Sequence, residues 1–410
     1  MANAEAVSLI IRIAQGLPTA ILGAALAYIA IRCIYLLYFH PLVQFPGPKI
    51  AAVSNTWYAY QWLSGRYPWA TEDVLRKYGD VVRIAPNELL FLTPQAFIDI
   101  HTSHVGSLET FVKTDLNDRG DAHGGIAFER DPVRHRKVAK QISPAFSSRS
   151  ITALEPTMHE HIDLFIKQMK TMEDSGKTER IDLAKWCNWL AVDISADMTY
   201  NRKMNQFRDM RNSNYLNVAM GFNRFTTVEQ VSLRFPFLKP FKNLFLPFST
   251  MTSMPEMVRK SRAEVHRRLS QQGNTQHLDF FEHLLPDVIP EDRQEMRHLE
   301  QLAGQLQFGG FEPVSSWIYG TLMYLLAEPG VCKTLTKEIR TSFENYGDIS
   351  PSVLKPLQYL NACLEESLRI FLSNNVGMPR ISPGAMVDGT FVPKGVYCQT
   401  SMFATARSQR

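Results

Sequence analysis

The feature that most constrains the fold is an apolar stretch from Leu299 to Leu326, LEQLAGQLQFGGFEPVSSWIYGTLMYLL. Apolar residues recur in it at helical spacing, and Pro329 marks a stop shortly after it. At 1.5 Å per residue, its 28 residues form a helix about 42 Å long, the width of a sizeable domain. Few surface helices are apolar on so many sides. The sequence therefore predicts a central, buried helix against which the other elements pack.

The middle of this helix has an unusual composition. The segment from Gly309 to Pro313, GGFEP, places two glycines, an acid and a proline where an ordinary core helix carries leucine and alanine. The glycines and the proline weaken the helical backbone and favour a bend. A carboxylate in an apolar interior is costly unless it has a partner or a chemical task. Glu312 is therefore a candidate functional residue.

The bulk composition limits the possible classes of protein. With 410 residues and 45% hydrophobic side chains, the chain can bury a large core. It has no internal repeat and no long low-complexity linker, so we expect one large domain, mainly α with small β-sheets (α+β). The net charge of +4 gives no reason to expect nucleic acid binding. The five cysteines show no metal-ligand spacing, which favours a reduced, intracellular chain.

The segment from Leu17 to Phe39 is apolar apart from Arg32, and as a helix it covers about 35 Å, enough to cross a bilayer. A cleaved signal peptide and a buried core helix are the alternatives, but the run is long for the first and too rarely interrupted by polar residues for the second. The proline-containing segment 40–48 then stiffens the connection. We expect residues 1–45 to form a membrane anchor and hinge, and residues 46–410 to form the globular domain.

Strand and helix patterns fill the rest of the chain. Residues 80–84 and 88–92 predict a β-hairpin, and Asp388-Gly389 predicts a tight turn between two short strands. A helix is expected over 357–371, where Glu366 and Arg369 lie at i and i+3 and can pair, although Glu365 can also pair with Arg369 at i+4.

The segment 134–140, RHRKVAK, is a basic cluster with two interpretations. It is either a solvated helix face, which is the usual fate of such a run, or a site for an anion such as the carboxylates of a cofactor. The sequence alone favours the solvated face.

The order of these features resembles that of the membrane-bound cytochrome P450 monooxygenases, particularly the fungal enzymes of secondary metabolism. Glu366-Ser-Leu-Arg369 is similar to the ExxR motif of that family, and the helix with Gly309-Gly310-Phe311-Glu312 resembles its oxygen-activating helix. The other matching features are the anchor, the Pro46-Gly47-Pro48 hinge, the early hairpin, the segment 143–147 after the basic helix, Pro379-Arg380 and the segment 388–393.

The resemblance implies a haem cofactor (heme), electrons from NADPH through a reductase, and hydroxylation or epoxidation of a hydrophobic small molecule. It implies that His135 and Arg380 face the haem propionates and that Glu366 and Arg369 brace the fold. It assigns Glu312 to proton relay with a nearby alcohol. It also implies a single-pass protein of the endoplasmic reticulum membrane, with its globular domain in the cytosol and with substrate-contacting loops at 107–129 and 222–248.

Three departures from the family pattern matter. Pro313, which has no hydroxyl, stands where the family has a threonine; Ser315 and Ser316 lie nearby, and Ser315 is our assignment for the relay alcohol. Ala139 replaces a second propionate-binding arginine, for which Lys140 or Arg136 could compensate. The chain also ends before the family's cysteine loop, so we assign no metal ligand. The alternative function is therefore an inactive truncated paralogue or an incomplete gene model, acting at most as a membrane-tethered binding protein.

Overall fold

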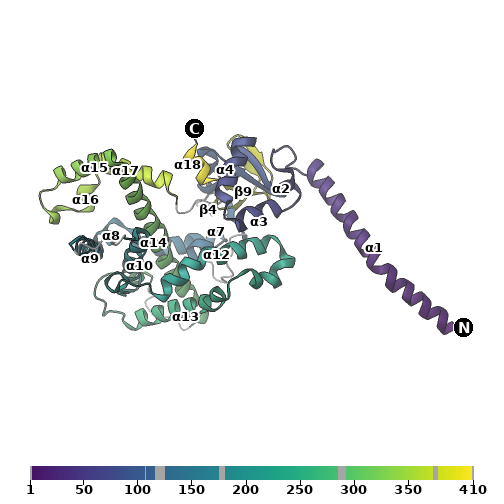
Figure 1. Ribbon diagram of the computed structural model, residues 1–410, viewed down its shortest axis with the longest axis horizontal. Coiled ribbons are helices and arrows are strands. Elements are labelled where there is room, and N and C mark those ends of the chain that lie inside the picture. The colour runs from purple at the N-terminus through teal and green to yellow at the C-terminus, as the bar shows by residue number, and fades with distance from the viewer. Residues whose placement is uncertain are drawn as a thin grey trace.

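The computed structural model describes residues 2–106, 108–115, 125–174, 181–284, 292–372 and 377–408. In this part of the chain the fold is mainly helical, with one five-stranded sheet and two small hairpins. Most of the helices gather at one end of the body, and the sheet lies at the other end together with several shorter helices, while the first helix projects away from both (Figure 1). The predicted fold class, mainly α with small β-sheets, is confirmed.

The central helix is α14 (Arg293–Ala327), which extends across the helical part of the molecule (Figure 1). The side chain of Asp292 caps its N-terminus by accepting hydrogen bonds from two backbone N–H groups of the first turn. Its main partner is α10 (Leu183–Tyr200), which is buried along most of its length. Residues of α14 such as Leu302 and Phe311 lie in the core, and the helix continues through Pro313 without interruption.

Burial of α14 is less complete than the sequence predicts. The side chain of Leu326, near its C-terminal end, is 71% exposed, and Val314 and Met323 are also exposed. The apolar periodicity predicts a buried helix, but it cannot show where the partner helix ends.

The five-stranded sheet has the order β1-β2-β9-β6-β5, and only the β2–β9 pair is parallel. The predicted hairpin of residues 80–92 is its β1–β2 edge. Its strands are β1 (Val81–Ala85), β2 (Glu88–Phe91), β9 (Tyr397–Thr400), β6 (Arg380–Ile381) and β5 (Val112–Lys113).

Two further antiparallel hairpins complete the strands of the described chain. They are β3 (His104–Val105) with β4 (Leu108–Glu109), and β7 (Ala385–Val387) with β8 (Thr390–Val392). The predicted turn between β7 and β8 is present. Asp388 and Gly389 there have φ angles of 44° and 73°, which is why this turn needs Asp-Gly.

The remaining helices surround this framework. They are α2 (Lys49–Val53), α3 (Thr56–Leu63), α4 (Tyr67–Tyr78), α5 (Pro94–His101), α6 (Gly125–Phe128), α7 (Pro132–Ile142), α8 (Ser148–Ala153), α9 (Glu155–Asp174), α11 (Gln206–Asp209), α12 (Asn214–Arg234), α13 (Phe248–Ser270), α15 (Pro329–Ser342), α16 (Pro351–Leu354), α17 (Gln358–Ile370) and α18 (Met402–Arg407), with 3₁₀ turns η2 (Ser143–Phe146), η3 (Pro236–Phe245), η4 (Phe280–His283) and η5 (Tyr346–Asp348).

The first helix, α1 (Ala2–Tyr38), extends away from the body as one long rod (Figure 1). Its segment Pro18–Tyr38 is long and apolar enough to cross a membrane, and only 6% of that segment is buried. The body begins at its C-terminal end. Leu36 and Leu42 are both buried, and Nη1 of Arg83 donates to the carbonyl of Leu36 at 2.9 Å.

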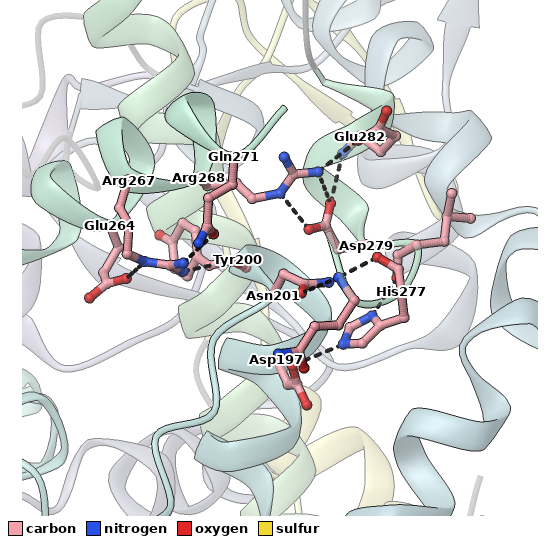
Figure 2. A network of polar contacts seen from close by, with 12 residues as sticks. Asp197, Tyr200, Asn201, Glu264, Arg267, Arg268, Gln271, His277, Asp279 and Glu282 are labelled. Carbon is pink, nitrogen blue, oxygen red and sulfur yellow. Dashed lines mark hydrogen bonds and ion pairs between the residues drawn. The ribbon is translucent and has the colours of Figure 1, made fainter. Parts of the chain in front are cut away.

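A polar network joins the C-terminal end of α10 to α13 and to the loop before η4 (Figure 2). Arg268 is fully buried there and binds Asp279 at 2.6 Å and Glu282 at 2.7 Å. Nε2 of His277 lies 3.0 Å from Oδ1 of Asp197. The loop between α13 and η4 is therefore held to the helical core by side chains.

Candidate functional site

Glu312 lies in the middle of α14 and is half-buried. The hydroxyl of Ser316, one helical turn further on, donates a hydrogen bond to its Oε1 at 3.4 Å. Burial raises the pKa of the Glu312 carboxyl above its ordinary value, and the hydrogen bond from Ser316 opposes this rise. Glu312 is thus an acid that takes up a proton more readily than a solvated glutamate.

Ser315, the assigned relay alcohol, is buried and faces α10. Its hydroxyl donates to the side-chain oxygen of Asn188. The structure therefore brings Ser316, and not Ser315, to Glu312. Sequence periodicity offers a signal for this arrangement, because residues at i and i+4 are neighbours on a helix surface.

The helix face that carries Glu312 is open at Gly309. A β-carbon added to Gly309 would meet no atom within 4 Å, whereas one added to Gly310 would lie 2.8 Å from Oγ of Ser195. The two glycines therefore serve different purposes. Gly310 permits the close approach of α10, and Gly309 lies on the side of α14 that other elements leave free.

The predicted propionate residues, His135 and Arg380, belong to one cluster of basic side chains. His135 comes from α7 and Arg380 from β6, and Lys113 of the neighbouring strand β5 joins them. Lys113 pairs with Arg380 in the β5–β6 register, and its Nζ donates to the carbonyl of Ile126 at 2.9 Å. Glu109 pairs with this cluster, since its Oε1 lies 3.1 Å from Nδ1 of His135, and Glu129 also attracts Lys113.

Burial lowers the pKa of every base in this cluster, and repulsion from neighbouring bases adds to the effect at Lys113 and His135. Burial lowers the pKa of Lys113 to about 8, with Glu109 opposing and Arg380 adding to the effect. Burial lowers the pKa of Arg380 as well, against the attraction of Glu109. The pKa of His135 is lowered by burial and by Lys113. An anion with two carboxylates would relieve this repulsion.

His101 borders the same cluster. Both of its ring nitrogens are buried without a hydrogen-bond partner, and burial, with a contribution from Arg380, lowers its pKa to about 4. Buried ring nitrogens without partners, beside crowded bases, fit a site for a polar ligand. Nothing in the sequence around Lys113 or His101 predicts this arrangement, because it depends on strand pairing between distant segments.

The other basic residues of the 134–140 segment behave differently. Arg134 is exposed and pairs with Glu129, and Arg136 donates to the carbonyl of Gly106 at 3.4 Å. Only His135 joins the described cluster through an ion pair, so the solvated-face interpretation holds for the neighbouring arginines. The expected substrate-contacting loop at 107–129 falls partly outside the described residues, at 107 and 116–124.

Glu366 and Arg369 form the predicted pair on α17. Nε and Nη2 of Arg369 each donate to a carboxylate oxygen of Glu366 at 2.6 Å, so Glu365 is not the partner. Nη1 of Arg369 also donates to the carbonyl of Ala406. Ser367, which follows Glu366 in the chain, accepts a hydrogen bond from Nε1 of Trp317 on α14 at 2.9 Å. The pair, whose side chains are about half exposed, therefore lies where α17 meets α18, while Ser367 of the same helix contacts α14.

The cysteines of the core are structural thiols. Cys398 of β9 is fully buried in the cluster that includes Leu89 and Phe91, and burial raises its pKa to about 12. Burial likewise raises the pKa of Cys187 to about 11. Within the described ranges, no group of three or more His, Cys, Asp or Glu side chains could hold a metal ion.

The candidate site thus combines an acid on a helix face, a cluster of bases suited to carboxylates, and a bidentate Glu–Arg pair. The family model described as "Cytochrome P450" matches residues 51–410. This protein belongs to the cytochrome P450 family.

Three curated relatives illustrate the membership. The chain is similar to cytochrome P450 monooxygenase TwmD of Talaromyces wortmannii, with 53% identity over 97% of this chain and 78% of the relative. It is also similar to the cytochrome P450 monooxygenases btcC of Colletotrichum orbiculare (32% identity, 93% of this chain, 74% of the relative) and poxC of Penicillium oxalicum (33% identity, 93% and 72%).

Proposed function

We propose that this protein binds haem and acts as a monooxygenase that hydroxylates or epoxidises a hydrophobic small molecule in fungal secondary metabolite biosynthesis. The observation that carries the proposal is the gathering of three partly buried bases, Lys113, His135 and Arg380, whose pKa values are lowered although Glu109 attracts all three. Haem brings two propionates, which match these bases in charge and hydrogen-bonding capacity. The organisms of the similar proteins support the assignment to fungal metabolism.

Each residue of the site has a distinct task in this proposal. Lys113, His135 and Arg380 hold the propionates, and Glu366 with Arg369 braces α17 against its neighbours. Glu312 takes up and releases protons on the open face of α14, and its raised pKa suits it to this task. When bound, the haem supplies the iron that activates molecular oxygen and transfers one oxygen atom to the substrate. Electrons come from NADPH through a reductase.

We further propose that α1 anchors the protein in the endoplasmic reticulum membrane with a single span and the body in the cytosol. The exposed apolar residues of Pro18–Tyr38 support this proposal. The 3₁₀ turn η3 adds a second apolar surface, because Phe237 is 70% and Leu244 is 80% exposed. Full-length protein that stays in the membrane pellet after alkaline carbonate, with its body open to protease on the cytosolic side, would support this topology.

A direct test of the basic cluster compares haem with haem dimethyl ester, in which both propionates are esterified. For the full-length protein, we expect Lys113→Met to weaken haem binding about tenfold and to leave binding of the ester unchanged. Arg76→Ala serves as the control, since Arg76 is an exposed base paired with Glu72. Equal effects of Lys113→Met on both ligands would refute the assignment of this cluster to the propionates.

The second candidate is the non-catalytic, membrane-tethered binding protein. The observation in its favour is that Cys187 and Cys398 are core thiols whose pKa is raised, so neither offers a thiolate. The carbon monoxide spectrum of the reduced, haem-loaded protein separates the two functions. A thiolate-type shift of the Soret band supports the monooxygenase, and its absence supports the binding protein.

A further inference from the structure

We infer that Ser316 is the residue that positions Glu312, providing the alcohol that Pro313 cannot provide. This inference rests on the proposed function, because it assigns the hydroxyl partner of the proposed relay acid. It differs from the sequence-based assignment, which gives this task to Ser315.

The geometry separates the two serines. Ser316 lies four residues after Glu312, and its hydroxyl donates to Oε1 of Glu312 at 3.4 Å. The hydroxyl of Ser315 instead donates to Asn188 of α10. A serine has a single hydroxyl proton, so Ser315 cannot donate a hydrogen bond to Glu312 while it donates to Asn188. Ser315 therefore joins two helices, and Ser316 is left for the acid.

The hydroxyl of Ser316 suits both protonation states of its partner. It donates to the carboxylate, and after rotation it can accept from the protonated carboxyl group, so contact persists whichever form is present. Burial favours the protonated form of Glu312, and the hydrogen bond from Ser316 favours the charged form. Among the described residues, no charged side chain on the helices packed against α14 shifts the pKa of Glu312. Ser316 is thus the polar group that tunes the acid.

The pair lies on the free side of α14. Gly309, Glu312 and Ser316 follow one another at i, i+3 and i+7, which places them on one helix face. No atom lies within 4 Å of a β-carbon added at Gly309, so packing leaves room beside this face. Pro313, on the same turn, has no side-chain hydroxyl. The hydroxyl of Ser316 is therefore the donor that the helix supplies to Glu312 there.

The test measures the protonation of Glu312 directly, in the full-length protein. Infrared difference spectra between the native protein and Glu312→Gln identify the carboxyl band of Glu312, and its intensity is followed from pH 4 to pH 9. We expect Ser316→Ala to move the midpoint of this band to higher pH, because the bond that stabilises the carboxylate is lost. Ser315→Ala removes the same group one position away and should leave the midpoint in place. Ser316→Thr retains the hydroxyl and should show the same midpoint as the native protein.

The possible outcomes decide the inference. An upward shift in Ser316→Ala alone, with rescue by Ser316→Thr and unchanged circular dichroism, supports it. An unchanged midpoint in Ser316→Ala, or a shift in Ser315→Ala instead, overturns it. Failure of the proposed function shows separately. If Glu312→Gln forms product at the native rate, Glu312 is not the relay acid, even where the infrared shift shows that Ser316 positions it.

Discussion

The guanidinium group of Arg234 binds both carboxylate oxygens of Glu88, with Nη1–Oε2 and Nη2–Oε1 distances of 2.5 and 3.1 Å. Arg234 ends α12 and Glu88 begins β2, so the pair joins the helical part of the molecule to the sheet. Both side chains are buried, and the guanidinium carbon lies 3.4 Å from the centre of the Tyr58 ring. Nε2 of Gln399 also donates to Glu88 at 2.6 Å. The two charges thus have partners in the interior of the protein.

Removal of one partner from this pair should be severely destabilising. We expect Arg234→Met to lower the free energy of unfolding by about 3 to 5 kcal/mol, because it leaves the Glu88 carboxylate buried without its counter-charge. Chemical denaturation of the full-length protein measures the change. The exposed pair of Arg76 and Glu72 provides the control, since Arg76→Ala should cost less than about 1 kcal/mol. Equal costs for the two substitutions would contradict the buried role of Arg234.

Two glycines of α14 should respond in opposite directions to alanine. At Gly309 an added β-carbon meets open space, so Gly309→Ala should stabilise the helix by about 0.5 to 1 kcal/mol. At Gly320 the added atom would lie 2.6 Å from the ring of Phe371, so Gly320→Ala should destabilise by about 1 to 3 kcal/mol. Thermal unfolding of both variants gives the comparison. A stabilising effect of Gly320→Ala would show that α17 moves away freely.

The sequence predicts local features of this fold well and distant pairings poorly. The turn at Asp388-Gly389 and the pairing of Glu366 with Arg369 depend on residues within a few positions of each other, and both are present. The contact between Arg234 and Glu88 depends on how α12 lies against the sheet, which no local pattern encodes.

The same distinction applies to the site. Glu312 is visible in the sequence as an acid within an apolar helix, whereas Lys113 reaches Arg380 only through pairing of β5 with β6. The choice between Ser315 and Ser316 lies between these cases. Both positions are helical neighbours of Glu312, and only the packing of Asn188 against Ser315 decides between them.

The contact between His277 and Asp197 should make stability depend on pH (Figure 2). The hydrogen bond to Asp197 raises the pKa of His277, with burial opposing, so this contribution is present below pH 6.5 and is lost as the pH rises through the raised value. Despite burial, hydrogen bonds from His161 and His277 lower the pKa of Asp197, so its contribution is lost only in strong acid.

Between about pH 4 and 6.5, therefore, His277→Leu should cost about 1 to 3 kcal/mol, and the cost should shrink above that window. Urea unfolding at pH 5.5 and pH 8.5 measures both values. Of the neighbouring charged groups, Asp279 also favours the protonated imidazole, so Asp279 must stay intact in these variants. His266→Leu is the control, because His266 is 56% exposed and pairs only at the surface with Glu300. A cost that is equal at both pH values would contradict the charged contact.

Haem retention should weaken in alkaline solution because of Lys113. Burial lowers the pKa of Lys113 to about 8, so its ammonium group, and the attraction for a propionate, is present below that pH and is lost above it. In the haem-loaded protein, the propionates favour the ammonium form of Lys113, so this charge is lost at a somewhat higher pH. We expect haem affinity to fall about tenfold between pH 7.5 and pH 10 in the native protein. Lys113→Arg keeps its charge throughout this range and should hold its affinity constant. A parallel fall in Lys113→Arg would assign the pH dependence to another group.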